Sequence, residues 1–430
     1  MALVDTGTCG MLRTVPSAPG PANAASARMT QSRRIPALDG LRGIAAAAVL
    51  DYHLSYGLHP GGVLGVDAFF VLSGFLITSL LLDEHRRTGT IDLLRFWARR
   101  ATRLWPPLAA FVLVTTIFAK DLGAKGSVSE YAHEVIAAMT WSMDALATKA
   151  PGLGRALGYT WTLAIEEQFY LLWPLVLLLL WRRLSARAMV VLLVVGATAS
   201  FSILVTQWHD TAFLPAVYTS PAARAFPILI GCSLAFARSD AQLVAGFTRW
   251  ARPAAVSWVG AALCLAAVVY PSARPVRLHP TIAYGTPAIV VGAALLVAHA
   301  AVGGDGLVVR FLASRPLRAL GAISYSLYLV QFPTIAVVQA RSHELLPGSG
   351  AGYHLLMVVI VVVVATALWW LVERPAIRLA HRIGPMRADR SDDERARAVP
   401  ATRLRLLGAA PAALVILGCA IAVLRPGPLG

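Results

Sequence analysis

The sequence has few charged residues, few cysteines and no apolar leader segment. Charged side chains make up 14% of the 430 residues, against about 25% in an ordinary soluble domain. The four cysteines form no CxxC pair and have no histidine at ligand spacing, so neither a disulfide framework nor a metal site is expected. The first 37 residues hold no apolar core of the kind a signal peptide needs. Disordered chains and nearly all soluble enzyme classes are thereby excluded.

Hydrophobic residues, in contrast, make up 57% of the chain, and the mean hydropathy is +0.65. They form runs of roughly 20 residues, which is the length a helix needs to cross a bilayer. The pattern predicts an all-α polytopic membrane helical bundle with ten core spans and an eleventh C-terminal span. The spans are expected near residues 38–55, 62–83, 104–119, 159–181, 188–206, 225–237, 254–271, 282–301, 319–339, 353–372 and 406–424.

The net charge of +16 is distributed unevenly between the two sides of this predicted bundle. With the N-terminus inside, inner segments hold 28 of the 38 Lys and Arg residues, outer segments hold nine, and Arg42 lies within the first span. This bias follows the positive-inside rule. It predicts a multi-pass plasma-membrane protein with a cytoplasmic N-terminus and an outer C-terminus, and it explains the basic charge without nucleic acid as a partner.

The connecting segments divide the chain into four predicted regions. These are a disordered tail at 1–34, a membrane domain at 35–380, a charged cytoplasmic linker at 381–405 and the extra span at 406–424. The outer connection 120–158, which contains Trp141 and Met143, predicts a short interfacial helix. The inner segment from residue 374 onward predicts a solvated linker.

Ionisable residues inside spans are costly, and each is by default a functional hypothesis. Arg42 and His53 are eleven residues apart in the first span, roughly 16 Å along a helix. The structural alternative is a snorkelling arginine and a hydrogen-bonded histidine. In the second span, small residues explain close helix packing, but packing does not explain Asp67.

Two further clusters combine charge with a span end. Arg99, Arg100 and Arg103 crowd the inner end of the third span, and guanidinium forks suit phosphate groups; the alternative is a positive-inside anchor. Glu166 and Glu167 lie near the outer start of the fourth span. They point about 100° apart on a helix, so one of them would orient the imidazole of a nearby histidine. The alternative is stabilisation of the helix dipole.

Together, these strings resemble the integral-membrane acyltransferase 3 family. The strings are LDGLRG followed by YH, GVDAFFVLSGFLIT, FWARRATRLWP and WTLAIEEQFYLLWP. Further matches follow in order at Arg224, at residues 323–329 and at 372–375, so the resemblance covers residues 35–380. One departure is the run Val330, Gln331, Phe332 and Pro333, where relatives often have a histidine.

The resemblance implies transfer of an acyl group, acetyl or another short one, from acyl-CoA to a hydroxyl, with no permanently bound cofactor. It places the Arg-x10-His signature on Arg42 and His53 and the Arg-x-x-Arg signature on Arg100 and Arg103. His53, Glu166 and Glu167 are then expected to be catalytic, and Arg42, Arg99, Arg100 and Arg103 to bind acyl-CoA. Further candidate site residues are Asp39, Asp67, Ser73, Tyr170, Arg224, Ser324, Tyr325 and Glu373.

Two hypotheses for the acceptor remain open within the acyltransferase class. The favoured one is a carbohydrate-containing acceptor of the cell envelope or a lipid-linked sugar; the other is a small glycosylated metabolite such as a macrolide antibiotic. A different class, a transporter or flippase of acylated or sugar lipids, would show paired broken helices in two related halves, and the sequence shows no such pairing. The expected partners are therefore acyl-CoA, the acceptor and the lipid bilayer.

Overall fold

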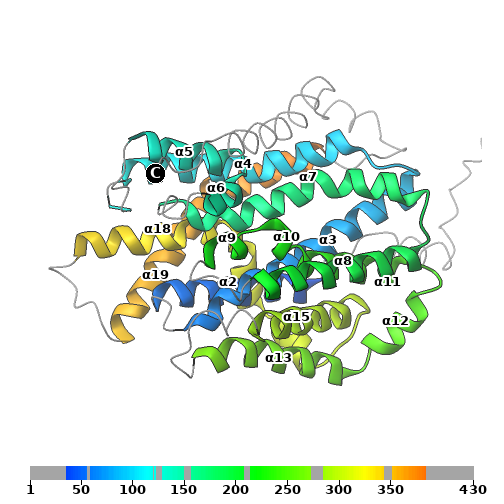
Figure 1. The fold of residues 1–430 in the computed structure, drawn as a ribbon. Helices are drawn as coiled ribbons and strands as arrows, with labels where there is room; N and C mark the ends of the chain where they lie inside the picture. Colours follow the sequence, from blue (N-terminus) through cyan, green and yellow to red (C-terminus); the bar gives the residue numbers. More distant parts are fainter. Residues whose placement is uncertain are drawn as a thin grey trace, which may run out of the picture. The chain divides into compact units, whose positions relative to one another are not determined.

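The computed structural model describes residues 35–383, apart from residues 56–58, 120, 123–127, 150–155, 208–213, 273–283 and 343–350. Within these ranges every regular element is a helix and there is no strand (Figure 1). The all-α prediction is thus confirmed. The predicted tail at 1–34, the linker beyond residue 383 and the eleventh span at 406–424 lie outside the described residues.

The longer helices correspond to the predicted spans. They are α2 (Pro36–Leu54), α3 (Gly65–Thr88), α4 (Leu93–Ile117), α7 (Trp161–Trp181), α8 (Ala186–Gln207), α11 (Phe226–Ser239), α13 (Ala254–Ser272), α15 (Thr286–Ala301), α18 (Ser324–Ser342) and α19 (Ala351–Leu368). Shorter elements connect them: η1 (Pro60–Leu64), α5 (Val128–Met139), α6 (Met143–Lys149), η2 (Gly158–Thr160), α9 (Leu214–Tyr218), α10 (Pro221–Arg224), α12 (Val244–Ala251), α16 (Leu307–Leu312), α17 (Arg315–Ala322), the π turn η4 (Trp369–Glu373) and α20 (Arg374–Ile383).

Four helices in the described part are long and apolar enough to cross a membrane by themselves. The number is up to six if two bent pairs each form one span: α11 with α12, bent by 113°, and α17 with α18, bent by 69°. The charge-bearing helices α2 and α4 fall outside this set. The total of ten core spans stays a prediction.

Glycines let pairs of helices approach until their backbones touch. A Cβ atom on Gly74 of α3 would lie 2.0 Å from the carbonyl oxygen of Ile228, and one on Gly231 of α11 would lie 2.1 Å from that of Val71. Such contacts are typical of membrane helix interfaces built from small residues. The prediction that small residues of the second predicted span allow close helix packing is confirmed at Gly74.

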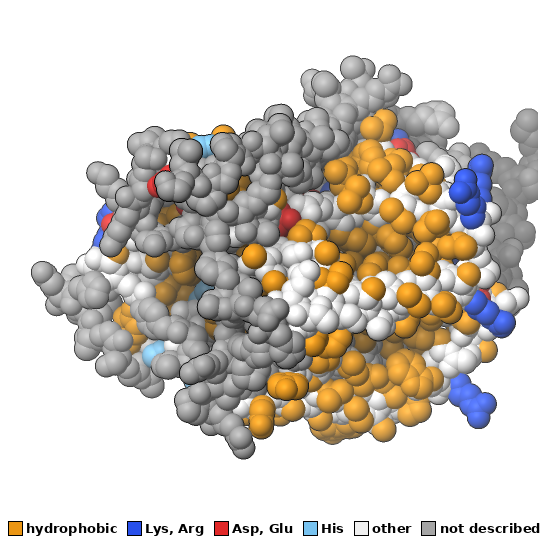
Figure 2. Space-filling model, viewed as in Figure 1, with side chains coloured by type: hydrophobic (Ala, Val, Ile, Leu, Met, Phe, Trp, Pro, Cys, Tyr) orange, Lys and Arg blue, Asp and Glu red, His pale blue; other side chains and the backbone are white. Residues whose placement is uncertain are grey.

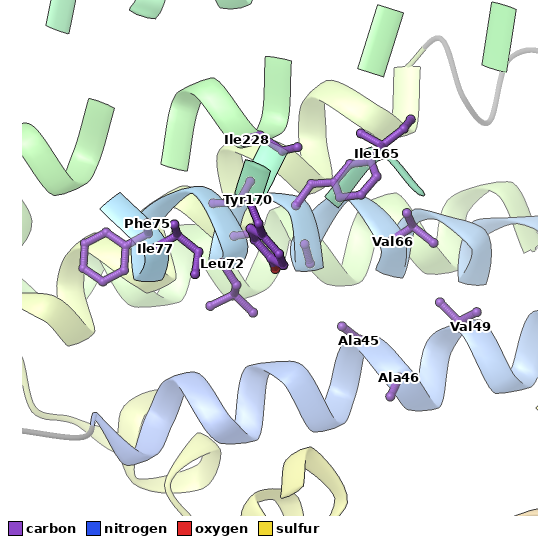
Figure 3. Close-up of a cluster of buried hydrophobic side chains, with 14 of the residues drawn as sticks. Ala45, Ala46, Val49, Val66, Leu72, Phe75, Ile77, Ile165, Tyr170 and Ile228 are labelled. Carbon is purple, nitrogen blue, oxygen red and sulfur yellow. The ribbon is translucent and has the colours of Figure 1, made fainter. Parts of the chain in front are cut away.

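The core is continuous across helices that are far apart in the sequence. Figure 3 shows Ala45, Ala46 and Val49 of α2 beside α3, with side chains of α7 and α11 completing the cluster. The small alanines keep α2 close to α3, and this proximity carries Arg42 toward the middle of the bundle.

The exterior is apolar over a wide area. Figure 2 shows hydrophobic side chains covering much of one face, with most of the visible Lys and Arg side chains at one end. Large aliphatic side chains such as Leu179 and Leu265 are more than 60% exposed. An apolar surface of this extent fits a protein surrounded by lipid.

Three segments differ from the sequence prediction. Helix α4 begins at Leu93, eleven residues before the expected span, because the Asp92 side chain accepts a hydrogen bond from the Arg95 amide at 3.0 Å and caps the helix. The arginines therefore lie in the first three turns of this helix. Residues 374–383 form helix α20, which buries Ala376, Ala380 and Ile383, so the prediction of a solvated linker is wrong for this stretch.

The outer connection also differs from its prediction. It forms two helices, α5 and α6, and Trp141 and Met143 are 4% and 0% exposed within the main hydrophobic core. The prediction of a single interfacial helix is therefore wrong. The connection packs into the bundle because its apolar residues are buried against α4 and α7, and this brings Trp141 to the site described next.

Candidate active site

Six charged side chains from four elements converge inside the bundle. Arg103 lies within electrostatic range of Arg42, Arg100 and Glu373, and Arg100 interacts with both Glu166 and Glu167. Three arginines thus face three glutamates, and this balance offsets part of the cost of removing charges from water. The six residues are Arg42 of α2, Arg100 and Arg103 of α4, Glu166 and Glu167 of α7, and Glu373 of the π turn.

Two hydroxyl groups hold Glu166 in place. The Ser73 hydroxyl donates to Glu166 Oε1 at 2.8 Å, and the Tyr170 hydroxyl donates to Ser73 Oγ at 3.0 Å while lying 3.4 Å from Glu166 Oε2. Tyr170 is one helical turn from Glu166, and Ser73 comes from the neighbouring α3. The predicted residues Ser73, Glu166 and Tyr170 therefore form one hydrogen-bonded group.

Glu373 enters the cluster from an unusual backbone. It ends the π turn between α19 and α20, is 1% exposed, and accepts a hydrogen bond from the Ser326 hydroxyl at 2.5 Å. Single π turns occur frequently at functional sites. The turn aims this carboxylate at Arg42 and Arg103, with which it interacts electrostatically.

A cavity of about 50 Å³ adjoins the charged cluster. Arg42, Glu166, Ser324 and Tyr325 line it, as do apolar residues of α3. The Tyr325 hydroxyl donates to the carbonyl oxygen of Leu104 at 2.9 Å, which ties α18 to α4. Four predicted site residues thus share one cavity.

The cavity wall also contains residues that the sequence interpretation missed. Thr162 and Tyr328 line it, with 2.5 Å between their hydroxyl oxygens. The Tyr328 hydroxyl also donates to the carbonyl oxygen of Tyr159. Thr162 lies one turn from Glu166, so helical spacing was the signal that could have found it.

A second, smaller cavity of about 20 Å³ lies beside Arg100 and Glu167 and is lined by Trp141. The backbone of Trp141 has φ of 51°, a left-handed conformation that is uncommon for a bulky residue and clusters at functional sites. The Gln168 amide donates to the Trp141 carbonyl oxygen at 3.1 Å and to Asp144 Oδ1 at 2.9 Å. The connection between α4 and α7 therefore closes one side of the charged cluster.

The contacts of His53 do not include Glu166 or Glu167. Its Nδ1 is 2.9 Å from the carbonyl oxygen of Val49, and its ring meets that of Phe332, which in turn meets Tyr159. Glu166 bonds instead to Ser73 and Tyr170, so the structure does not support an imidazole oriented by this glutamate. A carbonyl only accepts, so the Val49 contact places the proton on Nδ1 and leaves Nε2 as the basic nitrogen.

Two predicted residues lie away from the cavities. Arg99 Nη2 lies 3.7 Å from Glu84 Oε2, one turn away from Arg103 along α4. Asp39 is in the first turn of α2, where an acidic side chain stabilises the helix dipole. Neither lines the cavities beside the charged cluster.

Asp67 and Arg224, also predicted, contact each other. Arg224 Nη2 is 2.7 Å from Asp67 Oδ1, and both side chains are 0% exposed. The guanidinium carbon lies 4.7 Å from the centroid of the Tyr218 ring and 5.8 Å from that of Trp161. This ion pair joins α3 to α10 behind Phe70, which lines the larger cavity. It therefore supports the cavity wall.

Carboxylates, guanidinium groups and hydroxyls around a cavity inside an apolar helical bundle define a polytopic membrane enzyme. The chain matches the acyltransferase domain family over residues 35–374, and it belongs to that family. The resemblance inferred from the sequence strings is confirmed.

Two curated relatives illustrate the match. The chain is 33% identical over 327 residues to "O-acetyltransferase OatA" of Staphylococcus aureus, covering 73% of this chain and 52% of the relative. It is 29% identical over 318 residues to "Peptidoglycan O-acetyltransferase OatA" of Listeria monocytogenes, covering 70% and 50%. The chain thus spans about half the length of these relatives. No solved structure matches it.

Proposed function

We propose that the protein is a membrane O-acetyltransferase that moves an acetyl group from acyl-CoA to a hydroxyl of a cell-wall carbohydrate. The observation that carries this proposal is the convergence of Arg42, Arg100 and Arg103 with buried glutamates in one charged cluster that two cavities adjoin. The relatives' names, O-acetyltransferase and peptidoglycan O-acetyltransferase, support the reaction and the acceptor class.

Arg100 and Arg103 are the proposed contacts for the donor's phosphates. They lie in the first three turns of α4 and point toward the charged cluster, whereas Arg99 points toward Glu84. A guanidinium fork binds phosphate oxygens through two parallel hydrogen bonds. Arg42 then lies further along the path, and the roughly 16 Å rise from Arg42 to His53 is of the order of an extended pantetheine arm.

His53 is the proposed general base. Its Nε2 accepts the proton of the acceptor hydroxyl as the oxygen attacks the thioester carbonyl carbon. The carbon–sulfur bond then breaks, the coenzyme A thiolate leaves, and it takes the proton back from His53. The transfer is direct, in a ternary complex of enzyme, donor and acceptor.

The proposed acceptor is a sugar of the cell wall or its lipid-linked precursor. With the N-terminus in the cytoplasm and the C-terminus outside, His53 lies toward the outer end of its helix and the arginines of α4 toward the inner end. The donor would therefore enter from the cytoplasm and the acceptor from the outer side of the plasma membrane. Labelling of single cysteines placed in the loops before α4 and after α18 tests this orientation.

The decisive experiment uses the purified protein in detergent with acetyl-CoA. We expect release of free coenzyme A to rise when peptidoglycan fragments are added, with acetyl ester appearing on the glycan. The variant His53→Ala should lower turnover by about 10²–10⁴ without altering the melting temperature by more than a few degrees. Acetylation only of a cytoplasmic glycosylated metabolite would overturn the proposed acceptor, and wild-type-like turnover in the variant would overturn the base.

A further inference from the structure

Helix α18 presents a line of polar side chains on one face. Ser324, Tyr328 and Gln331 are separated by four and three residues, so they lie above one another on the helix. Ser324 and Tyr328 line the cavity at the charged cluster. Gln331 therefore lies on the same face of α18, one turn beyond the cavity-lining Tyr328 and next to Phe332, whose ring contacts His53.

Ser324 and Gln331 are both 1% exposed. Ser324 Oγ and both amide atoms of Gln331 have no hydrogen-bond partner among the residues that the structure describes. An unsatisfied buried carboxamide costs free energy that an aliphatic side chain of similar size would avoid. Side chains on a helix lean toward its N-terminus, which brings the Gln331 amide back toward Ser324 and the cavity.

We propose that Ser324 and Gln331 bind a secondary amide of a substrate. The Gln331 Oε1 accepts from the amide N–H, and the Ser324 hydroxyl, two turns away along the helix, donates to the amide carbonyl, which points the opposite way in a trans amide. A secondary amide has one donor and one acceptor, and these two side chains complement both. The apolar wall formed by α3 strengthens such bonds by excluding water.

This proposal rests on the proposed function, which supplies two sources of secondary amides. The pantetheine arm of acyl-CoA carries two of them, and N-acetylated cell-wall sugars carry one on each acetamido group. The cavity of about 50 Å³ has room for a few water molecules. Either ligand must therefore displace lining side chains when it enters.

The test compares Gln331→Leu with Gln339→Leu, a control on the same helix, two turns further along, whose side chain is half-buried and has only its Nε2 enclosed without a partner among the described residues. We expect Gln331→Leu to raise the Kd of S-acetyl-pantetheine or of N-acetylglucosamine oligomers, measured by calorimetry, by roughly threefold to tenfold per lost hydrogen bond. Its melting temperature without ligand should be equal to or above that of the wild type, because an unpaired amide has been removed. The control should leave the Kd unchanged, and Ser324→Ala should weaken binding in the same direction as Gln331→Leu.

Amide-free probes identify the source. A loss confined to S-acetyl-pantetheine, and absent with S-acetyl-mercaptoethanol in turnover assays, assigns the site to the donor. A loss confined to N-acetylglucosamine oligomers, and absent with glucosamine oligomers, assigns it to the acceptor. Unchanged Kd for both amide-bearing ligands, or a lower melting temperature of Gln331→Leu with no change in binding, would overturn the proposal. Binding is measured without turnover, so a wild-type protein that binds but does not transfer acetyl would overturn only the proposed function.

Discussion

Replacing Asp67 with Asn should destabilise the protein strongly while sparing the chemistry. The substitution preserves shape but removes the negative charge 2.7 Å from Arg224 Nη2. Both side chains are 0% exposed, so solvent cannot screen the guanidinium charge that is left behind. Removing one partner of such a buried pair costs about 3–5 kcal/mol. At a few degrees per kcal/mol, the melting temperature should fall by roughly 5–15 °C.

The assay is thermal unfolding in detergent, followed by intrinsic tryptophan fluorescence, together with the steady-state KM for acyl-CoA. The double variant Asp67→Leu with Arg224→Met removes both charges and should recover most of the lost stability, because apolar replacements of a buried pair are often neutral or stabilising. Since the pair supports the cavity wall, the recovered double variant should also keep its KM within about twofold. A stable Asp67→Asn variant would refute the uncompensated-charge argument. A stable double variant with no activity would show that one of the two residues contacts substrate.

Three further substitutions test separate parts of the structure. Arg103→Ala should raise the KM for acyl-CoA by roughly tenfold to a hundredfold, the range for a charged hydrogen bond, and Arg103→Lys should restore the KM only in part. An equal effect of Arg99→Ala would contradict the proposal that Arg103, and not Arg99, contacts the donor. Trp141→Ala should lower stability by about 3–5 kcal/mol, seen as a lower melting temperature, and an unchanged value would show that α5 and α6 do not depend on this residue. Gly74→Ala should prevent close packing of α3 against α11 and reduce the folded yield. The control Gly246→Ala should be neutral or stabilising by up to about 1 kcal/mol, because a Cβ atom there meets nothing within 4 Å. Equal folded yields of the two variants would argue against backbone contact at Gly74.

Hydropathy located the helices well because most of them face lipid or an apolar core. It failed at the start of α4, where Arg99, Arg100 and Arg103 made the sequence appear soluble. In the structure those charges have partners inside the bundle. Hydropathy averaged over a stretch of sequence does not detect a partner that comes from a distant helix. The same reasoning explains the α4–α7 connection, which the sequence predicts to be a short interfacial helix and which packs into the bundle with Trp141 buried.

The candidate site could be predicted by residue type but not by pairing. Rise along a helix gave the separation of Arg42 and His53, yet sequence does not determine which neighbour a side chain meets. Glu166 was expected near the imidazole and is instead held by Ser73 and Tyr170. Glu373 came only from the resemblance, because a π turn leaves no distinctive pattern in the residues that form it.

That π turn has a consequence for insertions and deletions. A π turn holds one residue more than an α turn, so everything after it is rotated by about 100° relative to an uninterrupted helix. Inserting a single residue between Trp369 and Glu373 would turn the carboxylate away from Arg42 and the apolar side of α20 away from α4 at the same time, whereas deleting one residue would let the turn close as an α turn and leave α20 in register. The number of residues in this turn thus sets both the direction of the acid and the docking of the following helix, so an insertion here cannot be absorbed as it is in a surface loop.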